Sequence, residues 1–384
     1  MKLVISKIFF IENISQVLVF STVIFTILYF LVGYFAIPSI DSEPLRDIKF
    51  INENLILKIY AFINSFIILI LFINIYKKLT ISFLMLFTFL WLTLSIFINQ
   101  ETPGPMYFFS ILNLYVIFYL YLKKSFRFEL SIYTIWVLII YTGLPILIYV
   151  LEPFFNIMNK LPPLFFSDSF RGFSFDRIEY SILLGYLIMI LIVEKKYFYL
   201  LPFFAYGLFI AESRAAIIAL TISVMYQYRN KKKVIIYIVI LAITFLIFFS
   251  VLSSRSEMGS DGGRIGLYYN TIHQIFNDPI RILFGYGKFY TPVELYNVIP
   301  HNWFLQTILN FGMVTLFFWI LIIINTWLKI NEKGKVFILY SLIVGIFQPG
   351  YDAFMFLPFS VLGYYLSIFY GRNKEGKIND NLIT

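Results

Sequence analysis

The chain has 384 residues, of which 60% are hydrophobic and 13% are charged, and one aqueous core cannot bury that much apolar surface. This composition excludes a soluble domain and predicts an integral membrane protein. The absence of cysteine excludes disulfides, thiolate metal sites and a cysteine nucleophile. The net charge of +9 arises mainly at short turns between apolar runs, which favours membrane orientation and contact with anionic lipid over nucleic-acid binding.

Apolar runs follow one another along the chain, and a hydrocarbon core requires about 20 apolar residues per helix. Single spans are expected at about 14–37, 55–76, 79–98, 105–122, 130–151, 178–193, 234–252 and 303–327. The first run is too long for the core of a signal peptide and has no small-residue cleavage site, so we expect it to be retained as a span.

Two further segments are too long and too polar to be one span each. Residues 197–228 would form a straight helix of about 48 Å, with Glu212, Ser213 and Arg214 at its middle. Basic clusters flank both ends, so two short helices with Arg214 at the outer turn are expected. Residues 336–370 divide in the same way near 348–352. Together these spans predict an all-α polytopic protein with about twelve transmembrane helices and both termini in the cytoplasm. We expect a single integral membrane domain over 1–384.

Lysines and arginines sort to opposite sides of these spans. Lysines dominate the short turns on the expected cytoplasmic side, as the positive-inside rule requires. The arginines on the other side are Arg46, Arg171, Arg177, Arg214, Arg255, Arg264 and Arg281. Because arginine forms bidentate contacts with phosphate, an arginine-rich outer face predicts a phosphate-bearing substrate there.

Two outer loops hold most of the polar residues that can carry chemistry. The first covers 152–177, and the second, 253–300, lies between the ninth and tenth spans. The second loop is long enough to contain short helices of its own, and loops of that length in a tight bundle usually carry function. It runs into His301 and Asn302 at the mouth of the tenth span.

Arg214 and Arg264 are the candidate phosphate ligands. Arg214 lies near the outer membrane boundary, where a guanidinium is costly unless it is paired; its alternatives to a phosphate contact are a salt bridge to Glu212 or a snorkelling anchor. Arg264 follows Asp261-Gly262-Gly263 in a turn that would let backbone amides approach an anion.

His301 is the candidate general base, because a neutral imidazole at a helix start can take a proton from a hydroxyl near neutral pH. A structural helix-start histidine is an equal alternative. His273 is interpreted as structural or solvated, and two histidines without a carboxylate cluster predict no metal site. Eight outer carboxylates remain alternative bases: Asp168, Asp176, Glu179, Glu212, Asp261, Asp278, Glu294 and Asp352.

Several of these segments, in this order, resemble the O-antigen polymerase and O-antigen ligase superfamily, the Wzy- and WaaL-type bacterial membrane glycosyltransferases. The resemblance covers about 165–325. The matching segments are Arg171-Gly172-Phe173-Ser174-Phe175, Ser213-Arg214-Ala215-Ala216, Gly285-Tyr286-Gly287, His301-Asn302-Trp303-Phe304-Leu305-Gln306 and Gly312. The departures are Ala215 in place of a glycine, Asp176-Arg177 in place of Pro-Asn, and Asn310 in place of an acidic residue.

This resemblance implies a GT-C-like fold in the bacterial cytoplasmic membrane, with the active site facing outside. It implies metal-independent and cofactor-free transfer of a glycan from undecaprenyl pyrophosphate to an acceptor hydroxyl. Arg214 and Arg264 would hold the pyrophosphate and His301 would be the base or would position the acceptor. The other expected substrate contacts are Arg171, Arg177, Arg255, Arg281, Gly285, Gly287 and Asn302.

Three functions remain open on the sequence alone. The favoured function is a polymerase, which would extend a lipid-linked repeat unit. The first alternative is a ligase, which would move finished glycan to the lipid A core and shares the donor and the motifs with the polymerase. A flippase for the same lipid-linked glycan is the non-enzymatic alternative, although the candidate residues gather on one face rather than at the bilayer midplane. Expected partners are membrane lipids, a chain-length regulator and a flippase, and no nucleic acid.

Overall fold

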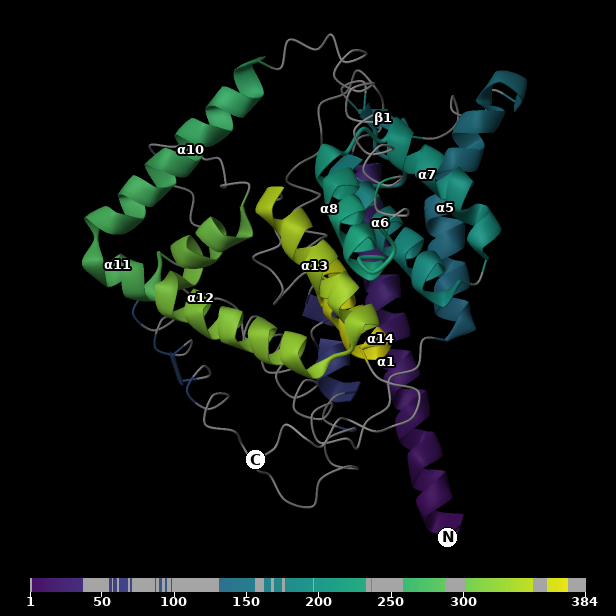
Figure 1. The fold of residues 1–384 in the computed structure, drawn as a ribbon, viewed down its shortest axis with the longest axis horizontal. Helices are drawn as coiled ribbons and strands as arrows, with labels where there is room; N and C mark the ends of the chain where they lie inside the picture. Colours follow the sequence, from purple (N-terminus) through teal and green to yellow (C-terminus); the bar gives the residue numbers. More distant parts are fainter. Residues whose placement is uncertain are drawn as a thin grey trace.

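The computed structural model describes residues 2–36, 131–155, 162–166, 169–174, 177–195, 197–232, 258–286, 302–347 and 358–371, together with residue 236 and scattered residues between 55 and 98. This part of the chain is mostly helical (Figure 1). Three of its helices are long and apolar enough to cross a membrane: Gln16–Phe35, Ile132–Phe155 and Trp303–Lys329. The spans expected at 79–98, 105–122 and 234–252 lie wholly or largely outside the described residues, and the span expected at 55–76 is described in part, as helix.

Helices account for nearly all of the described elements. In chain order, the elements are α1 (Lys2–Phe35), α5 (Ile132–Phe155), β1 (Phe165–Phe166), β2 (Ser169–Phe170), α6 (Arg177–Glu194), η2 (Phe198–Leu200), α7 (Leu201–Ile210), α8 (Arg214–Gln227), α10 (Met258–Asn277), α11 (Pro279–Phe284), α12 (Trp303–Lys329), α13 (Glu332–Phe347) and α14 (Pro358–Tyr370). The predicted division of 197–228 into two short helices is confirmed, with Arg214 as the first residue of the second. The antiparallel pair β1–β2, of two residues each, is the one departure from an all-α description among these elements.

The core is built around α6, which contacts α5, α7, α8 and α13. Almost every α6 side chain from Tyr180 to Val193 is buried. Gly185 lets the Tyr340 hydroxyl of α13 lie where a Cβ would otherwise be, and Gly363 of α14 does the same for the Tyr186 hydroxyl. Tyr186 also shares a hydrogen bond of 2.7 Å with Ser341. Close approach at glycines, with hydroxyls paired across the interface, is typical of helix packing in membranes.

The helices α10, α11 and α12 form a second group at the left of Figure 1, joined to the core through the contact of α12 with α13. The contact between α11 and α12 depends on two glycines, Gly285 and Gly312. Their backbone angles, φ 72° and ψ −175° for Gly285 and φ 83° and ψ 168° for Gly312, lie in a region that only glycine adopts readily. A Cβ on Gly312 would collide with the carbonyl of Leu283, and one on Gly285 with the backbone of Asn310 and Phe311.

Candidate functional site

The turn between α7 and α8 presents Arg214 at a helix N-terminus. Glu212 closes the turn in the left-handed conformation, with φ 52°. Ser213 is the N-cap residue of α8, but its hydroxyl makes no capping hydrogen bond. It is 3% exposed and its Oγ has no hydrogen-bond partner. Arg214 is exposed beside this buried hydroxyl.

Glu212 pairs with Arg177, the first residue of α6, at 3.7 Å between Oε2 and NH1. Within the described part of the chain, Arg214 forms no salt bridge, so the alternative of a Glu212–Arg214 pair is wrong for these residues. The pair with Arg177 joins the start of α6 to the α7–α8 turn. This ion pair holds the turn against the start of α6, while Arg214 is exposed.

The electrostatics of this turn suit an anion. The first amides of a helix lack partners within the helix, and the helix dipole places partial positive charge at that end. A cation such as Arg214 is unfavourable at a helix N-terminus on its own, but it becomes favourable once an anion lies between the guanidinium and the amides. The turn therefore offers backbone amides, a guanidinium and the Ser213 hydroxyl as a set of donors.

Arg171 is placed differently, because it is fully buried with 0% of its surface exposed. Its Nε donates to the carbonyl of Pro163 at 2.8 Å, and its NH1 donates to the carbonyls of Tyr34 at 3.2 Å and Ser174 at 3.0 Å. Burial lowers the pKa of Arg171 to about 10, so the guanidinium is protonated at neutral pH. These bonds join the loop between α5 and α6 to the end of α1, which gives Arg171 a structural role. A direct contact with substrate stays a prediction.

The prediction that Arg264 lies in an open glycine turn is wrong. Residues 258–277 form the continuous helix α10, and Gly262, Gly263 and Arg264 lie inside it. Amides inside a helix already donate to carbonyls four residues earlier, so they cannot cradle an anion as those of an open glycine turn would. The second loop nevertheless has its own helices, α10 and α11, as predicted.

Three of the predicted site residues lie outside the described residues: His301, Arg255 and Gly287. The roles predicted for these three residues stay predictions.

Comparisons with known proteins found no matching family model, no matching curated protein and no matching solved structure.

Three other predicted contacts have structural roles in the second loop. Asn302 is the N-cap of α12, where its Oδ1 accepts from the amides of Phe304 at 3.0 Å and Leu305 at 3.2 Å. Arg281 donates to the carbonyl of Gly285 at 3.3 Å and lies over the ring of Tyr286. Gly285 ends α11, with its amide donating to Arg281 at 2.8 Å. These residues stabilise the end of α11 and the start of α12, and the substrate contacts predicted for them stay predictions.

A buried polar face begins directly after Asn302 on α12. It consists of Trp303, Gln306, Thr307 and Asn310, which are each no more than 2% exposed. Gln306 donates to Asn310 at 2.9 Å, but Gln306 Oε1 and Thr307 Oγ1 have no hydrogen-bond partner. Thr271 of α10, a helix that contacts α12, has an unpartnered Oγ1 as well. Unpaired buried polar atoms are costly, so this face suits bound water or a polar ligand.

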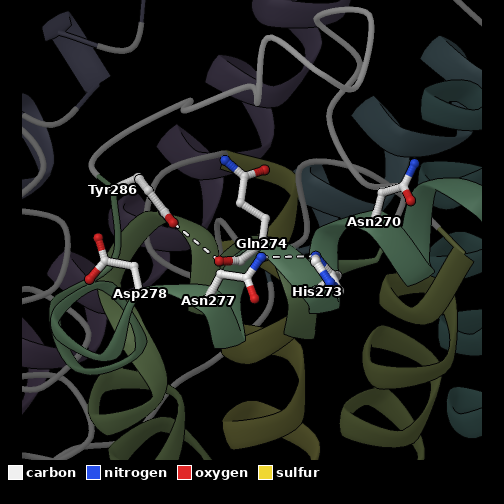
Figure 2. A pocket seen from close by; sticks show the side chains of 6 residues that line it. All are labelled: Asn270, His273, Gln274, Asn277, Asp278 and Tyr286. Carbon is white, nitrogen blue, oxygen red and sulfur yellow. Dashed lines mark hydrogen bonds between the residues drawn. The ribbon is translucent and has the colours of Figure 1, made fainter.

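Sequence reasoning missed a polar groove on α10 (Figure 2). Its lining residues are Asn270, His273, Gln274, Asn277, Asp278 and Tyr286, and its volume is about 420 Å³. The spacing of Asn270, His273, Gln274 and Asn277 at i, i+3, i+4 and i+7 is the signal of one helix face. That signal was in the sequence, but it is only meaningful once 258–277 is known to be helical.

Proposed function

We propose that this chain is a membrane glycosyltransferase that polymerises a bacterial surface glycan. The donor is a glycan on undecaprenyl pyrophosphate, and the acceptor is a hydroxyl of a second lipid-linked repeat unit at the outer face of the cytoplasmic membrane. The proposal rests on the resemblance of the segments between 165 and 325 and on the setting of Arg214 at the start of α8.

The setting of Arg214 carries the proposal. Arg214 and the first amides of α8 belong to the same turn, and the acid adjacent to it in the chain, Glu212, is engaged by Arg177. A doubly charged pyrophosphate would satisfy this excess of donors. The buried Ser213 hydroxyl, which lacks a partner, adds a neutral donor at the same place.

The proposed reaction needs no metal, because cationic donors take over the stabilisation of the leaving group. The acceptor oxygen attacks the anomeric carbon, a C–O bond forms, and the bond between that carbon and the pyrophosphate oxygen breaks. The acceptor proton passes to a base, for which His301 is our candidate, and undecaprenyl pyrophosphate leaves with the electron pair. Negative charge grows on the pyrophosphate as that bond breaks, and a fixed guanidinium in a partly dry site stabilises it.

The finer architecture belongs to the same proposal. About twelve spans, both termini in the cytoplasm and a GT-C-like arrangement would place the α7–α8 turn and the second loop outside. The turns after α8 and before α13 would then lie in the cytoplasm. There, Arg229 pairs with Glu332 at 2.8 Å, and Lys335 pairs with the same carboxylate at 2.9 Å.

The test is the size distribution of surface glycan in a strain that lacks the gene, restored with wild type, Arg214→Ala or Arg229→Ala. We expect wild type and Arg229→Ala to restore a ladder of repeat units and Arg214→Ala to leave lipid A core with a single repeat. Long chains stranded on undecaprenyl pyrophosphate with bare core in the deletion strain would instead identify a ligase. Single units stranded on the inner leaflet would identify a flippase.

A further inference from the structure

The groove on α10 combines neutral hydrogen-bonding groups with a volume that fits a small ligand. Its volume of about 420 Å³ lies within the usual range for ligand pockets, about 300 to 1,000 Å³. Four of its six lining residues, Asn270, His273, Gln274 and Asn277, come from α10 (Figure 2). The other two are Asp278, which follows α10 directly, and Tyr286 beyond α11.

Hydrogen bonds within the groove hold its polar groups in place. The side-chain amide of Asn277 forms a hydrogen bond of 3.0 Å with Nδ1 of His273, and this leaves Nε2 of the ring available to a ligand (Figure 2). The Tyr286 hydroxyl donates to the backbone carbonyl of Gln274 at 3.2 Å, and this fixes the far wall against α10. The ring of Tyr269 stacks on His273 with 6.3 Å between centroids and is 67% exposed beside the groove.

The charged groups at the end of the groove are already engaged by the protein. Asp278 Oδ1 accepts from the amides of Ile280 and Arg281 as the N-cap of α11, and its Oδ2 lies 3.9 Å from Nε of Arg281. Arg281 in turn donates to Gly285 and lies over Tyr286. The groove therefore offers amides and an imidazole, each a mixed source of donors and acceptors, rather than a cationic surface for a phosphate.

Apolar side chains run along α10 and α11 beside this polar face. On α10, three exposed side chains recur at helical spacing: Tyr269, Ile272 and Phe276. Ile280 and Leu283 are exposed on α11. A helix with one polar face and one exposed apolar stripe is typical of a helix that lies at a membrane surface. A groove at that level can reach the head of a lipid-linked molecule.

We propose that this groove binds the hydroxyl groups of a neutral sugar in the acceptor repeat unit. The inference deepens the proposed function and rests on it for the role of the sugar as acceptor. Vicinal hydroxyls both donate and accept, as do the amides of Asn270 and Asn277 and the ring of His273. The exposed ring of Tyr269 supplies an apolar platform for the face of the sugar.

The experiment measures binding of a free oligosaccharide to the purified full chain in lipid nanodiscs. The probe is one to three repeat units released by mild acid from the surface glycan of the producing strain, so it carries neither lipid nor pyrophosphate. We expect wild type to bind it and the double variant Asn270→Ala, Asn277→Ala to raise the Kd roughly tenfold, because two neutral hydrogen-bonding side chains are lost. Both positions are exposed on a helix, where alanine favours folding.

Two controls separate this inference from the proposed function. Ile272→Ala changes an exposed residue of the same helix outside the groove and should leave the Kd unchanged. Arg214→Ala should also leave the Kd unchanged while abolishing chain growth in cells. If wild type does not bind the oligosaccharide, or if the double variant binds it like wild type, the sugar site is overturned. If Arg214→Ala supports normal chain growth, the role of Arg214 fails. If wild type itself does not restore the ladder of repeat units, the proposed function fails, and the binding result still decides the groove.

Discussion

Arg177, at the start of α6, forms an ion pair with Glu212 in the α7–α8 turn, with 3.7 Å between NH1 and Oε2, whereas Arg214 in the same turn is exposed. The two arginines therefore have separable effects. Arg214→Ala should lower the rate of transfer by about 10² to 10³, by analogy with the loss of an oxyanion-hole donor, and leave the Tm unchanged. Arg177→Ala should reduce the free energy of unfolding by no more than about 1 kcal/mol, since the pair is partly exposed. Initial rates and thermal unfolding of the purified variants distinguish the two, and an equal loss of rate would contradict this separation.

Gly312 should tolerate no side chain. Gly312→Ala combines a backbone conformation reserved for glycine with a collision against the Leu283 carbonyl, so we expect a loss of about 3 kcal/mol or more. The matched control is Gly266→Ala on α10, where a Cβ meets nothing within 4 Å; it should stabilise by about 0.5 to 1 kcal/mol. Thermal unfolding in detergent measures both. A Tm for Gly312→Ala equal to or above that of Gly266→Ala would show that α11 and α12 do not meet in this way.

Replacing Arg171 should damage the fold before it damages the chemistry. Arg171→Met removes the donors to Pro163, Tyr34 and Ser174 and leaves those carbonyls unpaired in a buried site. Each buried carbonyl left without a hydrogen bond costs about 1 to 3 kcal/mol, so a marked loss of folded protein is expected. Arg171→Lys keeps the charge but cannot reach several acceptors at once, and its yield should fall between those of wild type and Arg171→Met. Yield of monodisperse protein after gel filtration tests this order, and normal yield of Arg171→Met with lost activity would favour a direct contact with substrate.

The contribution of Glu332 to the stability of the fold should depend on pH. Burial raises the pKa of its carboxyl, but hydrogen bonds from Tyr226 and Lys335 and the charges of Lys335 and Arg229 outweigh burial and bring the pKa below its ordinary value. A carboxyl of this kind adds stability above its unfolded pKa of about 4.3, and that stability is lost as the pH falls through the lower folded pKa. Wild type should therefore exceed Glu332→Gln in stability by up to about 1 kcal/mol at pH 7, and the difference should shrink as the pH falls below the unfolded pKa. A difference that does not shrink as the pH falls would exclude this cause.

The absence of cysteine in the chain makes its topology directly measurable. Gly266→Cys on α10 should react with a membrane-impermeant maleimide from outside intact cells. Asn230→Cys, in the exposed turn after α8, should react only after the membrane is opened. Labelling of both positions from the same side would contradict the proposed number of crossings between them.

Much of the helical framework follows from sequence alone, because membrane-length apolar runs and flanking charges are local signals. The division of 197–228 at Arg214 was predictable, since one helix of that length with a charged centre does not fit a bilayer. The helix through Gly262 and Gly263 was not predictable from those glycines. Tyr268, Thr271 and Ile275 recur at helical spacing, and Thr271 and Ile275 are buried. The helix α10 also packs against α12, and this packing outweighs the low helix propensity of glycine.

The candidate site was only partly predictable for a related reason. Arg171 was predicted to contact the substrate, and its burial depends on carbonyls that include one 137 residues away in α1. The ion pair of Glu212 with Arg177 rather than Arg214 depends on how α6 meets the α7–α8 turn. Contacts of this kind are set by tertiary packing, which leaves no local pattern in the sequence.

The most direct measurement uses purified protein and a synthetic repeat unit on undecaprenyl pyrophosphate, with no metal and no nucleotide sugar added. We predict that wild type forms dimers and longer chains and releases one undecaprenyl pyrophosphate for each bond made, and that Arg214→Ala does so about 10² to 10³ times more slowly. Wild-type protein that is folded and monodisperse but forms no dimer from this donor would contradict the proposed function, and an Arg214→Ala variant with the wild-type rate would contradict the role of Arg214.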